Sequence, residues 1–146
     1  MANATPILCF VGRSNSGKTT LIERLIQTLT QSGYRIAAIK HAGHGFDLDT
    51  EGKDSWRHKR AGASTVIVKS KIGLALFSDT EDSVLLTDLR DQYVRNVDLI
   101  LAEGWKSEHY PKIAVVRDHF GEIEVTSDGL LAVISRDPVD VSVPVL

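Results

Sequence analysis

The chain has 146 residues, of which 42% are hydrophobic and 25% are charged, and its formal net charge is −2 at pH 7. This length and composition are typical of one soluble globular domain, so we expect a single domain over residues 1–146. The near balance of acidic and basic side chains, with no basic block, argues against nucleic acid or an anionic membrane as a partner. No apolar run is long enough to span a membrane, and the N-terminus lacks the basic region of a signal peptide, so we expect a cytoplasmic location.

The first forty residues predict a strand, a helix and a second strand. The continuous apolar run over residues 7–11, which contains Cys9, is typical of a strand buried on both faces. Apolar residues then recur at helical spacing over residues 21–29, and Gly33 is a good helix stop. Residues 34–40 predict the second strand, and such a unit forms a parallel pair with a right-handed crossover.

The middle of the chain predicts a loop, two helices and a hairpin. Residues 41–53 are polar and glycine-rich, and a loop of this length suggests a function. We expect Asp54 to cap a short helix over residues 55–61. A β-hairpin is expected over residues 65–78 with its turn at 71–73, and a further helix over residues 81–93.

Three more apolar runs predict strands near the end of the chain, at residues 98–103, 112–117 and 130–135. Alternating strands and helices pack as helices on both faces of a mostly parallel sheet. The predicted fold is therefore a three-layer α/β domain of the P-loop NTPase kind, with a β-hairpin insertion.

Residues 12–19 read GRSNSGKT and match the P-loop pattern G-x-x-x-x-G-K-[ST] between a buried strand and a helix. Glycines let the backbone approach an anion, and successive N–H groups with the helix N-terminus form a nest for phosphate oxygens. Lys18 would contact the β- and γ-phosphates, the Thr19 hydroxyl would ligate Mg²⁺, and Thr20 is placed for an inner phosphate. The predicted phosphate-binding residues are Gly12, Ser14, Asn15, Ser16, Gly17, Lys18, Thr19 and Thr20.

A P-loop site also needs an acid for Mg²⁺ or its water, usually at the end of a neighbouring strand. Glu103 ends the apolar run 98–103, at the carboxyl end where open α/β sheets bind ligands, whereas Asp98 begins it. We therefore predict that Glu103 is a metal or water ligand and, with Lys18, a catalytic residue; a surface charge at the strand end is the alternative.

The loop after the second strand offers further ligands. Asp47 and Asp49 could complete the Mg²⁺ site, with Asp49 the stronger candidate, although a solvated loop is the alternative. His41 and His44 beside these aspartates could instead hold a transition metal, but no third nitrogen or sulfur ligand lies nearby.

The nucleotide base is expected to lie near the end of the last predicted strand. The Asn/Thr-Lys-x-Asp tetrad of many GTPases is absent from the sequence. Ser135 and Asp137 follow the last strand, where base-contact loops lie, and a carboxylate there could accept the two N–H groups that guanine presents and adenine does not. This favours GTP.

Together these motifs resemble the MobB family of molybdopterin-guanine dinucleotide biosynthesis adapter proteins. The matching stretches are FVGRSNSGKTTL at 10–21, IKH at 39–41 with His44 and Asp49, GKDSWRHKRAGA at 52–63, DLILAEG at 98–104, PKI at 111–113 and AVIS at 132–135. The resemblance implies a relative of dethiobiotin synthetase and nickel-insertion GTPases that binds GTP with Mg²⁺, hydrolyses it weakly and dimerises. It also implies assistance to a guanylyltransferase that attaches GMP to molybdopterin or its molybdenum form.

One departure and two alternatives follow from the resemblance. Family members usually continue into a C-terminal helix, whereas this chain stops after residues 141–146, so we expect a flank of the sheet to be bare or covered by a partner. A ligase resembling dethiobiotin synthetase would need a second substrate lysine, for which Lys40 is available. A metal-insertion GTPase would need a clearer Cys/His cluster than one cysteine in the first strand supplies.

We expect at most slow GTP hydrolysis. The sequence offers no identifiable catalytic glutamine, and Arg13 is the only arginine within the P-loop. The loop 41–53 is the expected element that changes shape with the nucleotide and meets the partner.

Overall fold

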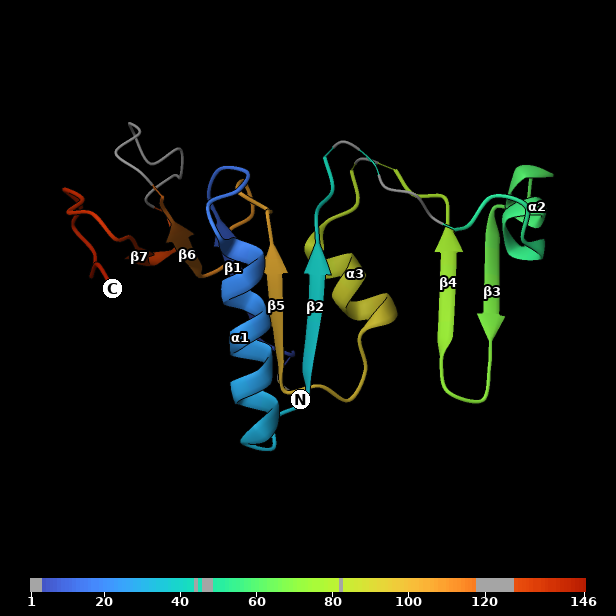
Figure 1. Cartoon of the computed structure of the whole chain (residues 1–146), viewed down its shortest axis with the longest axis horizontal. Coiled ribbons are helices and arrows are strands. Elements are labelled where there is room, and N and C mark those ends of the chain that lie inside the picture. Colours follow the sequence, from blue (N-terminus) through green and yellow to red (C-terminus); the bar gives the residue numbers. More distant parts are fainter. Residues whose placement is uncertain (1–3, 44, 46–48, 82, 118–127) are drawn as a thin grey trace. The chain divides into compact units, whose positions relative to one another are not determined.

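The computed structural model describes residues 4–43, 45, 49–81, 83–117 and 128–146 (Figure 1). They form two compact units, one made of the chain up to His41 together with Leu86–Leu146, and the other of Ala42–Leu85. The single domain over residues 1–146 stays a prediction. Among the described residues, no helix combines the length and hydrophobicity needed to cross a membrane.

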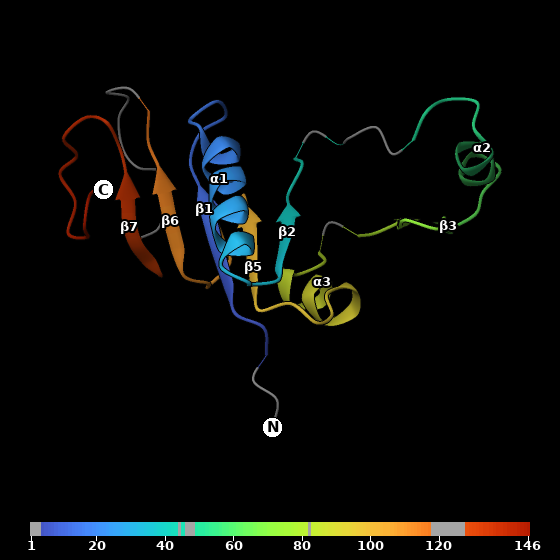
Figure 2. The ribbon, with the colours of Figure 1, turned by 60° about the horizontal axis from the view of Figure 1, so that its bottom comes forward.

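The first unit contains a parallel sheet with the strand order β2-β5-β1-β6-β7, in which all five strands point the same way (Figure 2). Its strands are β1 Ile7–Val11, β2 Ile36–Lys40, β5 Leu99–Glu103, β6 Lys112–Val115 and β7 Leu130–Ile134. The second unit holds α2 Asp54–Arg60 and the antiparallel hairpin of β3 Thr65–Lys69 with β4 Leu74–Ser78. The predicted α/β fold, with its mostly parallel sheet and its β-hairpin, is confirmed.

Helices cover the sheet of the first unit on both faces. On one face, Ile22 of α1 (Lys18–Gln31) packs against Phe10 and Leu101. On the other, Leu86 of α3 (Leu86–Tyr93) packs against Cys9. The adjacent residues Cys9 and Phe10 of β1 thus pack on opposite faces of the sheet, because successive side chains of a strand point to opposite faces. Burial raises the pKa of the Cys9 thiol to about 11, with small opposing effects of Lys112 and Glu108.

The predicted end of the first helix is confirmed. Helix α1 stops at Gln31, and Gly33 takes a left-handed φ of 90°. The Tyr34 N–H then closes the helix end by donating to the Leu29 carbonyl at 3.0 Å. This is the conformation that glycine adopts at lower cost than other residues.

Two predicted helix starts are wrong. Helix α3 begins at Leu86 rather than at residue 81, because the Leu86 N–H donates to the Glu108 carboxylate, at 3.3 Å, instead of continuing an earlier turn. Asp54 is the first residue of α2 and not its cap. The residue at the N-cap position is Lys53, whose side chain makes no capping hydrogen bond. The Asp49 carboxylate contacts the first turn instead, where it accepts a hydrogen bond from the Ser55 hydroxyl, and it also accepts one from the Thr50 N–H at 2.7 Å.

The outer edge of β7 is paired with a later part of the chain. The Val133 N–H donates to the Pro144 carbonyl at 2.9 Å, and the Leu146 N–H donates to the Val133 carbonyl at 2.8 Å. Three valines of this segment, Val139, Val141 and Val143, pack on the core below it. The expected bare flank is thus covered here by the chain itself.

Lys112 is a buried lysine at the amino end of β6, with only 1% of its surface exposed. Its ammonium donates to three backbone carbonyls, those of Glu108, Tyr110 at 3.2 Å and Asp128 at 3.3 Å. A buried charge is tolerated when its hydrogen bonds are satisfied in this way. The side chain therefore ties together the two segments that enter β6 and β7.

Replacing Lys112 by methionine should destabilise the fold while keeping the side-chain length. The three carbonyls would lose a charged donor inside the protein, which should lower the free energy of unfolding by about 2–4 kcal/mol. Urea denaturation should show a lower midpoint with an unchanged slope. Arg35→Met, which breaks an exposed ion pair, is the control and should cost less than about 1 kcal/mol. Equal midpoints for the two variants would contradict the assigned role.

Candidate functional site

The P-loop connects the carboxyl end of β1 to the first turn of α1. Gly12, Asn15 and Gly17 have positive φ angles of 144°, 63° and 98°. A Cβ atom added at Gly12 would lie 2.3 Å from the Val115 carbonyl oxygen of β6. The loop therefore packs so closely on the neighbouring strand that only glycine fits at its first position.

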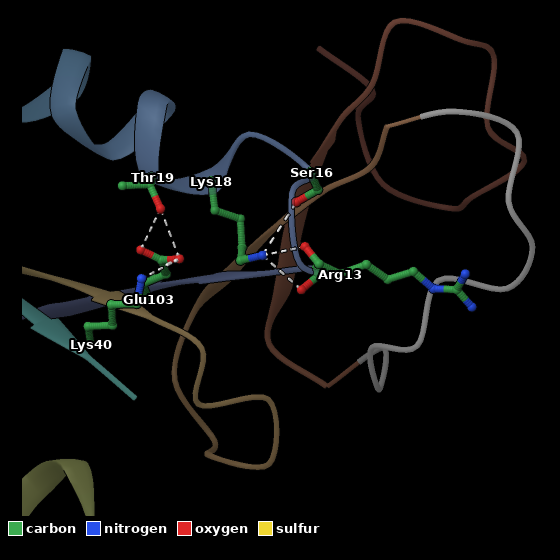
Figure 3. Close-up of polar contacts among 7 residues, drawn as sticks. Arg13, Ser16, Lys18, Thr19, Lys40 and Glu103 are labelled. Atoms are coloured by element: carbon green, nitrogen blue, oxygen red, sulfur yellow. Dashed lines mark hydrogen bonds and ion pairs between the residues drawn. The ribbon is translucent and has the colours of Figure 1, made fainter. Parts of the chain in front are cut away.

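Lys18 is folded into the curve of this loop, as Figure 3 shows. Its Nζ atom donates to the Gly12 carbonyl at 3.0 Å, to the Arg13 carbonyl at 2.5 Å and to the Ser16 hydroxyl at 3.4 Å. Although it is the first residue of α1, only 9% of its surface is exposed. The loop thus holds the ammonium at its centre.

The electrostatic surroundings of Lys18 are dominated by burial and by three nearby charges. Burial lowers the pKa of its ammonium, and the Glu103 carboxylate opposes this effect. The ammonium groups of Lys106 and Lys40 lower the pKa further. Several cations therefore act on the same small region.

Glu103 lies where the sequence predicts it, at the carboxyl end of β5 and beside the P-loop. The Thr19 hydroxyl is 3.1 Å from each of its two carboxylate oxygens. Lys40 Nζ lies 3.7 Å from the same carboxylate (Figure 3). Asp98 lies at the opposite end of the strand and pairs with Arg35 at 3.0 Å, which lowers the pKa of Asp98.

Thr19 and Glu103 together supply the ligands that a hard divalent cation prefers. Mg²⁺ is bound through oxygen atoms, usually one or two carboxylates with phosphates and water completing the shell. A hydroxyl and a carboxylate in contact, beside an ammonium-filled P-loop, fit such an ion. In the part of the chain that the structure describes, no group of three or more His, Cys, Asp or Glu side chains is placed to hold a transition metal.

Further candidate ligands come from the loop after β2. Asp49 belongs to the other compact unit, and the hydrogen bonds from Ser55 and Thr50 lower the pKa of its carboxyl. Its predicted role as a metal ligand stays a prediction. His44 and Asp47 lie outside the described residues. His41 is described, and its ring lies against that of Trp105 at 5.2 Å between centroids.

The candidate base-binding residues follow β7. The Asp137 N–H donates to the Ser135 hydroxyl at 3.2 Å, and the Ser135 N–H donates to the Leu146 carbonyl at 3.2 Å. Of the remaining candidates in the P-loop region, Ser14, Asn15 and Thr20 are exposed. Their contacts with a nucleotide stay predictions.

The sequence did not point to Trp105 or assign Lys40 to this site. Trp105 has a left-handed φ of 55°, which is rare for a bulky residue, and follows Gly104 with a φ of 97°. Its buried indole N–H has no hydrogen-bond partner among the described residues. The sequence signal for Lys40 is its position at the end of a predicted strand. Trp105 lies two residues after the end of another predicted strand.

Comparisons with known proteins point to one family. The family model described as molybdopterin guanine dinucleotide synthesis protein B matches residues 7–136. A molybdopterin-guanine dinucleotide biosynthesis adapter protein of Haemophilus influenzae is 40% identical over 143 residues, covering 97% of this chain and 80% of that protein. The adapter protein of Escherichia coli K12 is 40% identical over 148 residues, covering 97% and 84%.

Solved structures of the same family are also similar. The crystal structure of Bacillus subtilis MobB superposes with a TM-score of 0.78 and 32% identity, covering 96% of this chain and 88% of that one. A MobB homologue from Bacillus stearothermophilus gives a TM-score of 0.68 with 26% identity, covering 95% and 85%. The match to the family model over most of the chain, and these relatives, show that the chain belongs to the MobB family of molybdopterin guanine dinucleotide synthesis proteins.

Proposed function

We propose that this chain is a GTP- and Mg²⁺-binding adapter that assists the attachment of GMP to molybdopterin. The observation that carries the nucleotide part is the contact of Thr19 with both oxygens of Glu103, at 3.1 Å, beside the Lys18 ammonium. The adapter part rests on family membership and on the names of the relatives.

Each residue of the site has a separate task in this proposal. Lys18, released from the loop carbonyls, neutralises the β- and γ-phosphates, while the backbone N–H groups of the P-loop donate hydrogen bonds to the oxygens of the inner phosphates. Thr19 and Glu103 would hold Mg²⁺, which would supply positive charge that neutralises the phosphates. Glu103 or Asp49 would orient the attacking water. Ser135 and Asp137 contact the guanine base.

The proposed hydrolysis is slow because the described site offers no arginine to the reacting phosphate. Figure 3 shows that the Arg13 side chain points away from Lys18, although its carbonyl accepts a hydrogen bond from the Lys18 ammonium. An arginine that stabilises the developing charge is worth about 10³–10⁵ in rate in enzymes that use one. A slow GTPase suits an adapter whose nucleotide state regulates a partner.

The partner in this proposal is a molybdenum cofactor guanylyltransferase, with molybdopterin or its molybdenum form as the shared substrate. The loop after His41 begins at the carboxyl edge of the sheet, which makes it the proposed reporter of the nucleotide state. A second copy of the chain is the further proposed partner. The ligase and metal-insertion alternatives have no specific observation in their favour.

Lys18→Ala should weaken GTP binding by roughly 10- to 100-fold, the value of a charged hydrogen bond to phosphate. Isothermal titration with GTP and with ATP would measure both this loss and the preference for guanine. Circular dichroism should show an intact fold, because Lys18 contacts the loop rather than the apolar core. A folded variant with the affinity of the natural protein would rule out the P-loop as the nucleotide site.

Glu103→Gln should remove the Mg²⁺-dependent gain in GTP affinity and lower hydrolysis, while metal-free affinity stays within about twofold. The amide keeps the size of the side chain but gives up the charge that the metal needs. Asp98→Asn, at the amino end of the same strand, is the matched control and should change neither quantity. If the glutamine variant kept the natural metal dependence, the metal ligand would have to be sought elsewhere, first at Asp49.

The adapter role predicts a complex with a purified molybdenum cofactor guanylyltransferase that is tighter with GTP than with GDP. Sedimentation velocity with each nucleotide would measure it, and Lys18→Ala should abolish the difference. Lys53→Glu, in the loop that follows His41, should weaken the complex more than it weakens GTP binding. Failure to detect any complex with GTP present would contradict the adapter role.

A further inference from the structure

Lys40 is a second cation at the metal site that the P-loop pattern does not include. The parallel register pairs Phe10 of β1 with Glu103 of β5, and Glu103 with Lys40 of β2. The Lys40 ammonium consequently lies 3.7 Å from Glu103, on the side of the carboxylate away from β1. Because adjacent strands are about 4.8 Å apart, Lys40 starts roughly 10 Å from the strand that carries the P-loop.

Several charged side chains act on the Lys18 ammonium at this edge of the sheet. Lys106 and Lys40 lower the pKa of this ammonium, and the Glu103 carboxylate raises it. Like charges brought together raise the free energy of the protein, and a polyphosphate relieves this repulsion. The site is therefore arranged for a ligand with several negative charges.

The ion pair between Lys40 and Glu103 is easily opened. The Lys40 side chain is 61% exposed and its nitrogen is beyond hydrogen-bond distance from the carboxylate, whose residue is only 16% exposed. Pairs of this kind contribute little to stability. A divalent cation on Glu103 competes for the same carboxylate charge and leaves the lysine free to move.

The position of Lys40 determines which phosphate of a bound nucleotide its ammonium can contact. The backbone nest between β1 and α1 would hold the inner phosphates, and Thr19 and Glu103 would hold a metal that supplies positive charge near the outer ones. A cation two strands away from β1 is remote from the nest and close to the metal ligand. The outermost phosphate is the one within its range.

We propose that Lys40 contacts the terminal phosphate of the bound nucleoside triphosphate and so distinguishes it from the diphosphate. This inference rests on the proposed nucleotide function. It makes Lys40 a binding residue whose loss affects triphosphate and diphosphate unequally, in contrast to Lys18, which serves both. The Lys40 ammonium lies 3.7 Å from the Glu103 carboxylate, so only a small movement separates this place from the outer phosphate.

The test compares the affinities for GTPγS and GDP, both with Mg²⁺, by isothermal titration. Lys40→Met should weaken GTPγS binding about tenfold and GDP binding less than twofold, and Lys40→Arg should keep most of the selectivity. Arg35→Met is the matched control, because Arg35 is 63% exposed and pairs with Asp98 across the same two strands at their other ends. It should change neither affinity.

A second arm separates phosphate contact from an effect through Glu103. In the Glu103→Gln background, Lys40→Met should still lower the preference for GTPγS, because a direct contact does not need the carboxylate. An effect that disappears in this background would make Lys40 a partner of Glu103 alone and would overturn the inference. Equal losses for both nucleotides, or no loss, would also overturn it.

If the natural protein binds neither GTPγS nor GDP, both the proposed function and the inference about Lys40 are contradicted. If the natural protein binds nucleotide and the Lys40→Met variant has the same affinities, the proposed function still holds and only the role of Lys40 is excluded. Thermal unfolding of each variant should match that of the natural protein, since an exposed and weakly paired lysine contributes little to stability.

Discussion

The parallel pairing of β1 with β5 is the constraint on which the site depends. The register that sets Phe10 beside Glu103 delivers the carboxylate to the Thr19 hydroxyl at the start of α1. A slip of one residue would turn Glu103 to the other face of the sheet, because side chains alternate along a strand. The buried residues on both sides of β1 therefore determine how Thr19 and Glu103 meet as well as the stability of the fold.

The two ends of this sheet are built differently. At the amino ends, the Lys112 ammonium is satisfied by backbone carbonyls, and a Cβ atom at Gly129 would meet the Tyr110 carbonyl at 2.6 Å. At the carboxyl ends, polar side chains of Lys40, Thr19 and Glu103 are held in weaker and partly exposed contacts. The carboxyl ends also include Trp105, a bulky residue that adopts a left-handed backbone beside His41.

Local patterns were sufficient for the P-loop, the strands and the position of Glu103, because each depends on residues close together in sequence. The start of α3 was not predictable, because the Glu108 carboxylate that accepts its first N–H lies 22 residues further along. The same holds for Asp49, because periodicity cannot show its hydrogen bond with Ser55 in the first turn of α2. The place of Lys40 depends on the strand order, which the spacing of apolar runs leaves open.

The burial of the single cysteine makes it possible to label introduced cysteines selectively. Cys9 is fully enclosed in β1, and its pKa of about 11 leaves only about one thiol in ten thousand ionised at pH 7. Because the thiolate is the reactive form, maleimide reagents should not react with Cys9 in the folded protein. A cysteine introduced on each compact unit could therefore carry a fluorescent dye without removal of the natural one. Energy transfer between the two dyes would then measure the distance between the two units.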